Sequence, residues 1–311
     1  RHLDSPRHPL VQAVRRLLRS SRARREQGLL VVEGPRLVEE ALRAGAGVQQ
    51  LFVAEQPHVP AAAEAAGGPL PWERLEQLLE LAHERGAELI RCGPRVMAAI
   101  TDTEHPQGVV AVVRLPQPGG DFGGAPPRRW RRGLALLVDG VQDPGNAGTL
   151  VRSACGAGAD GVVFSWDSAD PYGPKALRAS AGAVFRLQVL RLPPGQELAR
   201  EANALRSAGW TVAALQPRDG VVYHQADLTR PVALVVGREG EGLRPWARSC
   251  CQLFLSVPLE QGLESLNAAV AASVVLFEAA RQRWRLSRGG NPPGGLDRPS
   301  ALYGRDRKSV V

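Results

Sequence analysis

The first 115 residues alternate between amphipathic stretches and short apolar runs. Apolar positions at helical spacing predict helices at 10–25, 35–44, 72–85 and 96–101. Short apolar runs predict strands at 29–33, 48–53, 88–92 and 108–115. The alternation predicts a small α/β sandwich over residues 1–115.

A second pattern, of strands that are apolar throughout, occupies residues 133–285. Strands are predicted at 134–138, 161–165, 186–190, 210–215, 232–236 and 253–257. A turn at 143–148 is followed by a predicted helix that ends at about residue 156. Further helices are predicted at 174–182, 196–208, 244–250 and 266–285. Continuously apolar strands alternating with helices predict an α/β domain whose parallel sheet is covered on both faces. Ligands of such sheets bind beyond the carboxyl ends of the strands.

Two segments lack this periodicity. Residues 116–132 are rich in proline, glycine and arginine, which predicts a flexible linker between the domains. The same composition from Ser287 onward predicts a disordered tail over 286–311.

Charge indicates a polyanionic partner. The chain has 39 lysines and arginines against 31 aspartates and glutamates, for a net charge of +8. Eight of the first 25 residues are arginine, and residues 128–132 read Arg-Arg-Trp-Arg-Arg. This clustering favours nucleic acid over a generally basic surface. Trp130 could stack on a base or cover apolar surface in the linker.

Other classes of protein receive no support. No apolar run reaches the length that spans a membrane, and no signal segment is apparent at the start. The four cysteines show neither metal-ligand nor disulfide spacing, so we expect buried thiols in a reducing compartment and no metal site.

Three turns, at 143–152, 236–243 and 263–267, carry the candidate chemistry. In the first, Asn146 could simply cap a helix. Arg152 would then lie about a turn and a half into that helix, where a guanidinium suits a phosphate or a developing oxyanion. The second turn is rich in glycine but lacks the dinucleotide fingerprint and a P-loop lysine. The third either caps the final helix or lines an adenine pocket.

In order, sequence and spacing, these turns resemble the motifs of the SpoU branch of the SPOUT (TrmH-like) methyltransferases over about residues 133–283. The first half is similar to the L30e-like substrate-binding domain of that family, notably at 28–34 and 37–42. The resemblance implies S-adenosylmethionine-dependent methylation of a ribose 2′-hydroxyl in RNA. It also implies a deep trefoil knot over about 232–285 and a homodimer with the final helix at its interface.

The resemblance assigns residues to roles. The implied cofactor-binding residues are Leu215, Gly237, Val257, Leu259 and Leu266. The implied catalytic residues are Asn146, Arg152, Glu239, Ser265 and Asn267. The implied RNA contacts are Arg15, Arg22, Arg25 and Arg152. The family assigns Arg152 to activating the hydroxyl, but a guanidinium keeps its proton beyond pH 12. We expect Arg152 to stabilise the forming alkoxide or an adjacent phosphate instead.

Several alternatives stay open. The full L30e-like domain favours ribosomal RNA, with transfer RNA or an antibiotic-resistance target in ribosomal RNA as alternatives. A ribosome-assembly factor that binds RNA without turnover is the non-enzymatic alternative. The expected location is a bacterial cytoplasm, and a mitochondrial origin is the other possibility.

Overall fold

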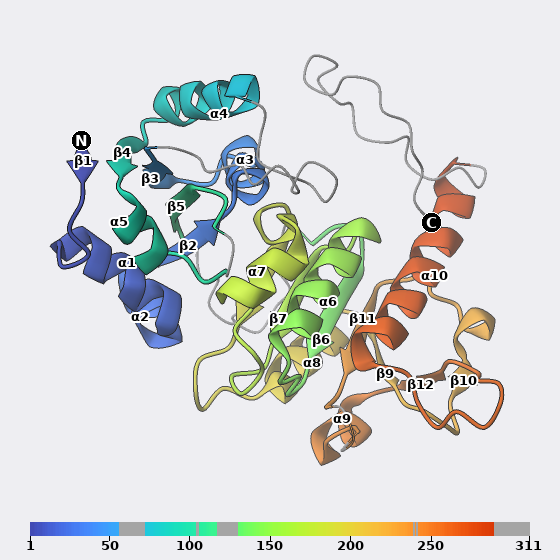
Figure 1. The fold of residues 1–311 in the computed structure, drawn as a ribbon. Helices are drawn as coiled ribbons and strands as arrows, with labels where there is room; N and C mark the ends of the chain where they lie inside the picture. The colour runs from blue at the N-terminus through green and yellow to red at the C-terminus, as the bar shows by residue number, and fades with distance from the viewer. Residues whose placement is uncertain (56–71, 104–105, 117–129, 239, 241, 289–311) are drawn as a thin grey trace.

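The computed structural model describes residues 1–55, 72–103, 106–116, 130–238, 240 and 242–288, which form two sheets with flanking helices (Figure 1). The smaller sheet holds β1 (His2–Leu3), β2 (Leu29–Glu33), β3 (Val48–Ala54), β4 (Glu88–Cys92) and β5 (Val109–Arg114). The larger sheet holds β6 (Leu134–Val138), β7 (Gly161–Phe164), β8 (Gln188–Arg191), β9 (Thr211–Leu215), β10 (Val221–Val222), β11 (Val232–Val236) and β12 (Leu253–Ser256). All strands of the smaller sheet precede the predicted linker in the sequence, and all strands of the larger sheet follow it.

The helices fall close to their predicted positions. In the first half they are α1 (Pro9–Arg19), α2 (Ser21–Gln27), α3 (Pro35–Arg43), α4 (Trp72–Glu84) and α5 (Pro94–Ala99). In the second half they are α6 (Pro144–Gly156), α7 (Pro174–Ser180), α8 (Leu198–Ser207), α9 (Pro245–Cys250) and α10 (Ala268–Arg288), with short 3-10 turns at Ala183–Phe185 and Tyr223–Gln225. None of the helices in the described ranges is long and apolar enough to cross a membrane.

The small sheet is mixed, with the order β1-β4-β3-β5-β2. β5 runs antiparallel to both β2 and β3, whereas β3 and β4 are parallel. The single helix predicted over 10–25 is wrong, because Ser20 is extended (φ −123°, ψ 110°) and divides it. The Ser20 hydroxyl accepts a hydrogen bond from the Ala23 amide (3.1 Å) and so caps α2.

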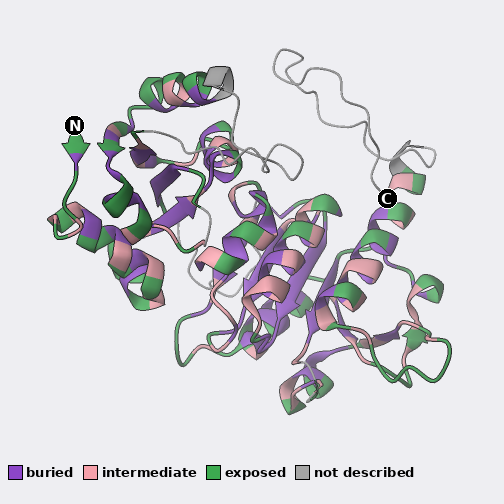
Figure 2. Cartoon of the chain, viewed as in Figure 1, coloured by how far each residue is buried: buried purple, intermediate pink, exposed green. Residues whose placement is uncertain are grey.

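The large sheet is entirely parallel, with the order β10-β12-β9-β11-β6-β7-β8, and the predicted parallel α/β class is confirmed. β6 and β11 are buried along their whole length at its centre, as their continuous apolar sequences require (Figure 2). β1 and β10 were not predicted, because two residues show no periodicity.

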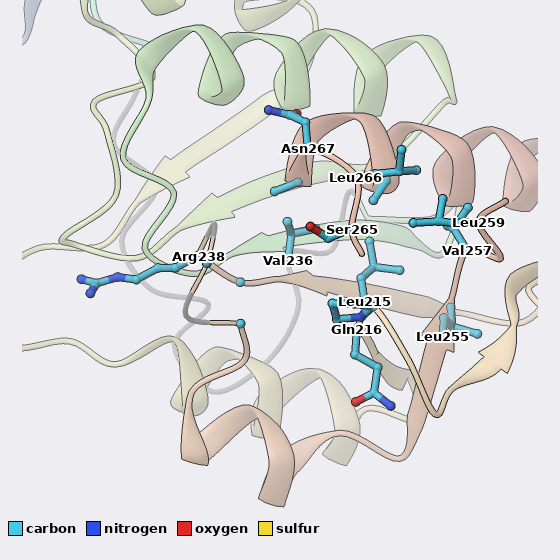
Figure 3. Close-up of a pocket in the computed structure, with 16 residues that line it drawn as sticks. Leu215, Gln216, Val236, Arg238, Leu255, Val257, Leu259, Ser265, Leu266 and Asn267 are labelled. Carbon is cyan, nitrogen blue, oxygen red and sulfur yellow. The ribbon is translucent and has the colours of Figure 1, made fainter. Parts of the chain in front are cut away.

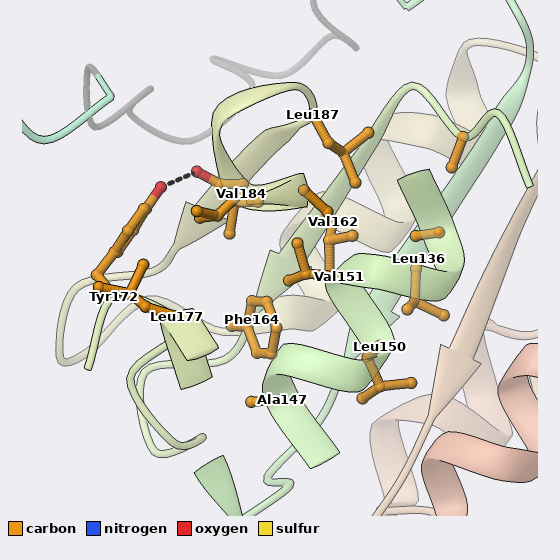
Figure 4. Close-up of a cluster of buried hydrophobic side chains, with 14 of the residues drawn as sticks. Leu136, Ala147, Leu150, Val151, Val162, Phe164, Tyr172, Leu177, Val184 and Leu187 are labelled. Carbon is orange, nitrogen blue, oxygen red and sulfur yellow. Dashed lines mark hydrogen bonds between the residues drawn. The ribbon is translucent and has the colours of Figure 1, made fainter. Parts of the chain in front are cut away.

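α6 and α7 pack closely over one face of the large sheet (Figure 4). Gly148 permits this contact, since a Cβ there would lie 2.3 Å from the Ala176 carbonyl oxygen. Beneath the helices, the fully buried Phe164 and Leu150 fill the space above the strands. The buried hydroxyl of Tyr172 donates a hydrogen bond to the Val189 carbonyl (2.6 Å), which satisfies the polar atom in this apolar cluster.

The last part of the predicted linker is tightly held. The carboxylate of Asp160 accepts hydrogen bonds from four consecutive amides, those of residues 131–134. Trp130 is only 7% exposed, packs against Trp210 (ring centroids 5.9 Å apart) and donates to Gln188. Trp130 therefore covers apolar surface, and the alternative that it stacks on an RNA base is wrong. Residues 117–129 of the predicted linker lie outside the described part.

The end of α10 changes the predicted start of the C-terminal tail. α10 continues to Arg288, so the predicted tail begins too early, and its remainder lies outside the described residues.

All four cysteines are free thiols, and three are buried, whereas Cys155 is half-buried. Burial raises the pKa of Cys92 to about 11 and that of Cys251 to about 12, so these thiols stay protonated and unreactive at neutral pH.

Ion pairs join the two halves of the molecule. Arg24 of α2 is 5% exposed and contacts the carboxylate of Asp170, which follows β7 (N–O 2.6 Å). The same guanidinium donates to the carbonyls of Leu17 and Leu18 at the end of α1. On the α7 side, Arg178 contacts Asp102 (2.9 Å). The small domain is therefore docked against the large one through specific charged contacts.

Candidate active site

A cavity of about 470 Å³ lies at the carboxyl ends of β9, β11 and β12 (Figure 3). Its walls come from the ends of these strands, the loop after β11 and the segment that leads into α10. The lining residues are Leu215, Gln216, Pro217, Val236, Gly237, Arg238, Gly240, Gly242, Leu255, Val257, Leu259, Ser265, Leu266, Asn267, Ala268 and Ala271. The volume lies within the range of small-molecule sites, and the lining is mostly apolar with polar groups at the edge.

The five residues predicted to hold the cofactor, Leu215, Gly237, Val257, Leu259 and Leu266, all line this cavity. Figure 3 shows the Leu215, Val257 and Leu266 side chains gathered around it. A mostly apolar cavity of this kind suits a purine ring. The structure thus brings the predicted set together, while its role in cofactor binding stays a prediction.

Asn146 and Asn267 connect the first turn to the third. The Asn267 side-chain amide donates a hydrogen bond to the Asn146 side-chain oxygen (3.2 Å). The Asn267 side-chain oxygen accepts from the amides of Ala269 and Val270 and so caps α10. The N-cap of α6 is Asp143, and not Asn146 as one interpretation held, because Asp143 accepts from the Asn146 amide (2.9 Å). Asn146 is thereby left in the first turn of α6, facing the segment before α10.

The other predicted catalytic residues are less closely gathered. The Arg152 side chain is exposed on α6 and makes no hydrogen bond or ion pair with any other residue in the described ranges. It is also absent from the cavity lining. Ser265 lines the cavity and is exposed. Glu239 lies outside the described residues.

A charged network that the sequence did not predict supports the glycine-rich loop. The Asp167 carboxylate contacts Arg238 (2.8 Å) and Arg244, and it accepts a hydrogen bond from the Ser165 hydroxyl (2.8 Å). Burial alone would raise the pKa of Asp167, but the hydrogen bonds from Arg244 and Ser165 outweigh it and lower that pKa. Asp167 is therefore ionised at neutral pH, and it holds the loop against β7.

Asp139, directly after β6, is the buried member of the same network. It is 1% exposed, lies 3.1 Å from Arg244 and accepts from the Trp246 indole (2.9 Å). Burial raises the pKa of Asp139, against the opposing effect of Arg244. No local sequence signal marks Asp139 or Asp167, because their partners lie 71–107 residues away in the chain.

Gly237 is the position in this loop where a side chain cannot fit. A Cβ there would lie 2.5 Å from the Gly242 carbonyl oxygen, across the bridge that joins Arg238 to Gly242. We predict that Gly237→Ala opens this bridge, deforms the cavity wall and weakens S-adenosylmethionine binding at least tenfold. Isothermal titration calorimetry measures the affinity. Gly209→Ala is the control for a general loss of stability: its positive φ (85°) strains the backbone, but the residue lies outside the cavity lining and nothing lies within 4 Å of the added methyl group, so the affinity should stay unchanged. Unchanged affinity in Gly237→Ala would contradict this prediction.

A parallel α/β sheet with a loop-built, apolar cavity beyond its strand ends defines a protein that binds a small cofactor or substrate at that edge. Residues 133–277 match the model of the SpoU rRNA methylase family, and residues 8–111 match the MRM3-like substrate binding domain.

Known proteins resemble the chain over most of its length. An uncharacterized tRNA/rRNA methyltransferase of Synechocystis sp. is 33% identical over 92% of this chain and 95% of its own. The 23S rRNA (guanosine(2553)-2′-O)-methyltransferase RlmP of Bacillus subtilis is 30% identical over 84% of this chain and 92% of its own. The crystal structure of the SpoU methyltransferase AviRb from Streptomyces viridochromogenes, solved with AdoMet, superposes with a TM-score of 0.74 at 30% identity. That match covers 89% of this chain and 98% of AviRb.

The chain belongs to the SpoU rRNA methylase family, as the three turns predicted.

Proposed function

We propose that the protein transfers the methyl group of S-adenosylmethionine to a ribose 2′-hydroxyl of ribosomal RNA. The observation that carries the proposal is the cavity at the ends of β9, β11 and β12, beside which Asn267 hydrogen-bonds Asn146. Relatives of the chain in sequence are named 23S rRNA 2′-O-methyltransferases. The basic composition and the substrate-binding domain agree with an RNA partner.

The lining of the cavity suits S-adenosylmethionine in polarity and charge. Its apolar side chains, such as Leu215 and Leu266, suit the adenine ring. Arg238 is the one cationic side chain of the lining, and it is directed away from the cavity in Figure 3 and paired with Asp167. Its charge therefore does not oppose a bound sulfonium. When bound, the cofactor supplies an electrophilic methyl group.

The residues around the cavity are proposed to hold the acceptor in line and to favour loss of its proton. Fixing two reactants in an attacking geometry can lower a barrier by about 7–11 kcal/mol. The bond from Asn267 fixes Asn146 at the cavity edge. Arg152 is proposed to stabilise the alkoxide or a neighbouring phosphate, and Glu239 to orient Asn146 or Arg152. Ser265 and Asn267 are proposed to shape the turn that lines the cofactor site.

The small domain is proposed to contact RNA through its arginines. Arg22 and Arg25 are exposed on α2, and Arg15 is half-exposed on α1. Arg22 contacts Glu26 (2.6 Å), which partly neutralises its charge, whereas Arg25 donates to the Ser21 hydroxyl. Phosphate contacts of this kind give affinity that falls as salt rises.

Three further properties are proposals. A homodimer through α10 is supported by two exposed apolar side chains, Val270 (47%) and Phe277 (44%), which lie two helical turns apart on one side. A trefoil knot over about 232–285 is proposed from membership of the SpoU family alone. A bacterial cytoplasm is the proposed location, since relatives such as RlmP come from bacteria, and a mitochondrial location is the alternative.

The test is transfer of tritium from labelled S-adenosylmethionine to ribosomal RNA isolated from cells that lack the protein. We expect label on ribosomal RNA with the wild type and at least a hundredfold slower transfer with Asn146→Ala. Asn203→Ala, an exposed asparagine on α8, is the matched control and should transfer normally. Label on transfer RNA alone would show that transfer RNA, and not ribosomal RNA, is the substrate. Cofactor binding without transfer to RNA or to ribosomal particles would contradict the proposed activity.

A further inference from the structure

Trp166 is an exposed aromatic residue at the active edge of the large sheet. It lies two residues beyond β7, at the same carboxyl edge as the cavity. Its exposure is 47%, whereas Trp130 and Trp210 are buried. Isolated exposed apolar side chains are ordinary, so exposure alone gives Trp166 no function.

The backbone on both sides of Trp166 is fixed by side-chain hydrogen bonds. The Arg191 guanidinium donates to the Trp166 carbonyl (3.0 Å) and to that of Ser168 (2.9 Å). The Ser165 and Ser168 hydroxyls both accept from the Gly140 amide. The next residue, Asp167, is held by Arg238 and Arg244. An exposed indole is thus presented from a loop that is already fixed, so little of the protein has to be ordered when a ligand contacts the indole.

Positive charge surrounds this loop. The Ser21 hydroxyl accepts hydrogen bonds from both Arg191 (2.8 Å) and Arg25 (3.1 Å), and so connects the loop to the arginine-rich α2. The loop and its contacts include the arginines Arg24, Arg25, Arg191, Arg238 and Arg244, against the aspartates Asp139, Asp167 and Asp170. The surplus of arginine favours phosphate groups beside the indole.

The position also suits the RNA that would enter the cavity. β7 is separated from β11 by β6 alone, so their ends lie about 10 Å apart. One strand of RNA can reach both the cavity edge and Trp166. Aromatic side chains next to basic groups bind single-stranded RNA by stacking on its bases.

We propose that Trp166 stacks on a base of the RNA strand close to the methylated nucleotide, while the exposed arginines of α2, Arg22 and Arg25, bind its backbone. The proposal rests on the proposed RNA substrate. RNA would then contact both domains: its bases contact the catalytic domain at Trp166, and its phosphates contact the substrate-binding domain. An indole can stack on any of the four bases. This contact therefore raises RNA affinity and positions the strand, but it contributes little to sequence specificity.

The test compares binding of a labelled, short oligoadenylate with that of the same oligomer made with abasic residues. We expect Trp166→Ala in the full chain to weaken oligoadenylate binding by about 5- to 150-fold, and Trp166→Phe to keep most of the affinity. The salt dependence should stay unchanged, because the phosphate contacts remain. The abasic oligomer should bind Trp166→Ala and the wild type equally.

Controls separate this proposal from folding and from the proposed enzyme activity. Val221→Ala removes another exposed apolar side chain, on β10 at the far edge of the sheet, and should bind oligoadenylate normally. S-adenosylmethionine affinity should be the same in Trp166→Ala and the wild type. Equal oligoadenylate affinity, a smaller salt slope, or a changed oligomeric state in Trp166→Ala would overturn the stacking role. Failure of the wild type to methylate RNA while it still binds bases through Trp166 would overturn the activity alone.

Discussion

Replacing Arg152 with alanine is expected to slow methyl transfer to RNA by about 10²- to 10³-fold, the cost of losing one group that stabilises a developing oxyanion. Cofactor affinity should not change, because Arg152 lies outside the cavity lining. Single-turnover transfer at saturating RNA measures the first quantity, and calorimetric titration of S-adenosylmethionine measures the second.

Two variants sharpen the interpretation of the Arg152 result. Arg152→Lys keeps the charge but loses the planar fork of donors, so it should recover only a small part of the rate. Near wild-type turnover in Arg152→Lys would contradict the proposed role. Arg206→Ala removes another exposed helical arginine, on α8, and should leave the rate unchanged.

The second large effect is expected at the buried ion pair between the domains. The side chains of Arg24 and Asp170 are 6% and 14% exposed. Arg24→Ala leaves a buried carboxylate without its cation and two carbonyls, those of Leu17 and Leu18, without a donor. We expect the free energy of unfolding to fall by about 3–5 kcal/mol. Urea denaturation followed by circular dichroism measures it, and hydrogen exchange resolves the domains if they unfold separately.

Matched variants isolate the role of charge in this pair. Arg24→Met combined with Asp170→Leu removes both charges and should recover most of the lost stability. Arg22→Ala removes an exposed arginine of the same helix, and no measurable loss is expected. A stability for Arg24→Ala close to the wild type would show that the domains are held by other contacts.

The same pair gives the protein an acid sensitivity with a definite sign. Burial would raise the pKa of Asp170, but the Arg24 charge and its hydrogen bonds outweigh burial and lower that pKa. Because the pKa of Asp170 is lower in the folded state than in the unfolded state, the ionised carboxylate stabilises the fold. This stabilisation is complete when the pH is above the unfolded-state pKa of about 4. This stabilisation is lost as the pH falls from there through the folded-state pKa. The Arg24→Met, Asp170→Leu variant should lack this component of acid unfolding.

Local patterns were sufficient to predict most elements of the fold. The centre of the large sheet follows from apolar runs such as 134–138 and 232–236, which no exposed strand could tolerate. Helix α2 was missed as a separate element because the arginine-rich pattern continues across Ser20, while the break depends on a backbone angle and a side-chain cap. β1 and β10 exist only through pairing with distant strands, so their two residues carry no signal of their own.

The candidate site also has a part that local sequence predicted and a part that it did not. The five predicted cofactor-binding residues line one cavity, because each turn follows a strand of the same parallel sheet and strand ends of one direction meet at one edge. The network of Asp139, Asp167 and Arg244 could not be predicted, since its members come from three different loops.

By itself, the sequence determined the class of each domain, the family and the turns that build the site, because these depend on periodicity and on short motifs. Only the tertiary structure decided that Trp130 is buried, that Arg24 joins the domains, and that Trp166 stands exposed at the same sheet edge as the cavity. Those properties depend on which side chains from distant segments meet. Burial and charge pairing are set by these long-range contacts, and a local pattern of residues does not contain them.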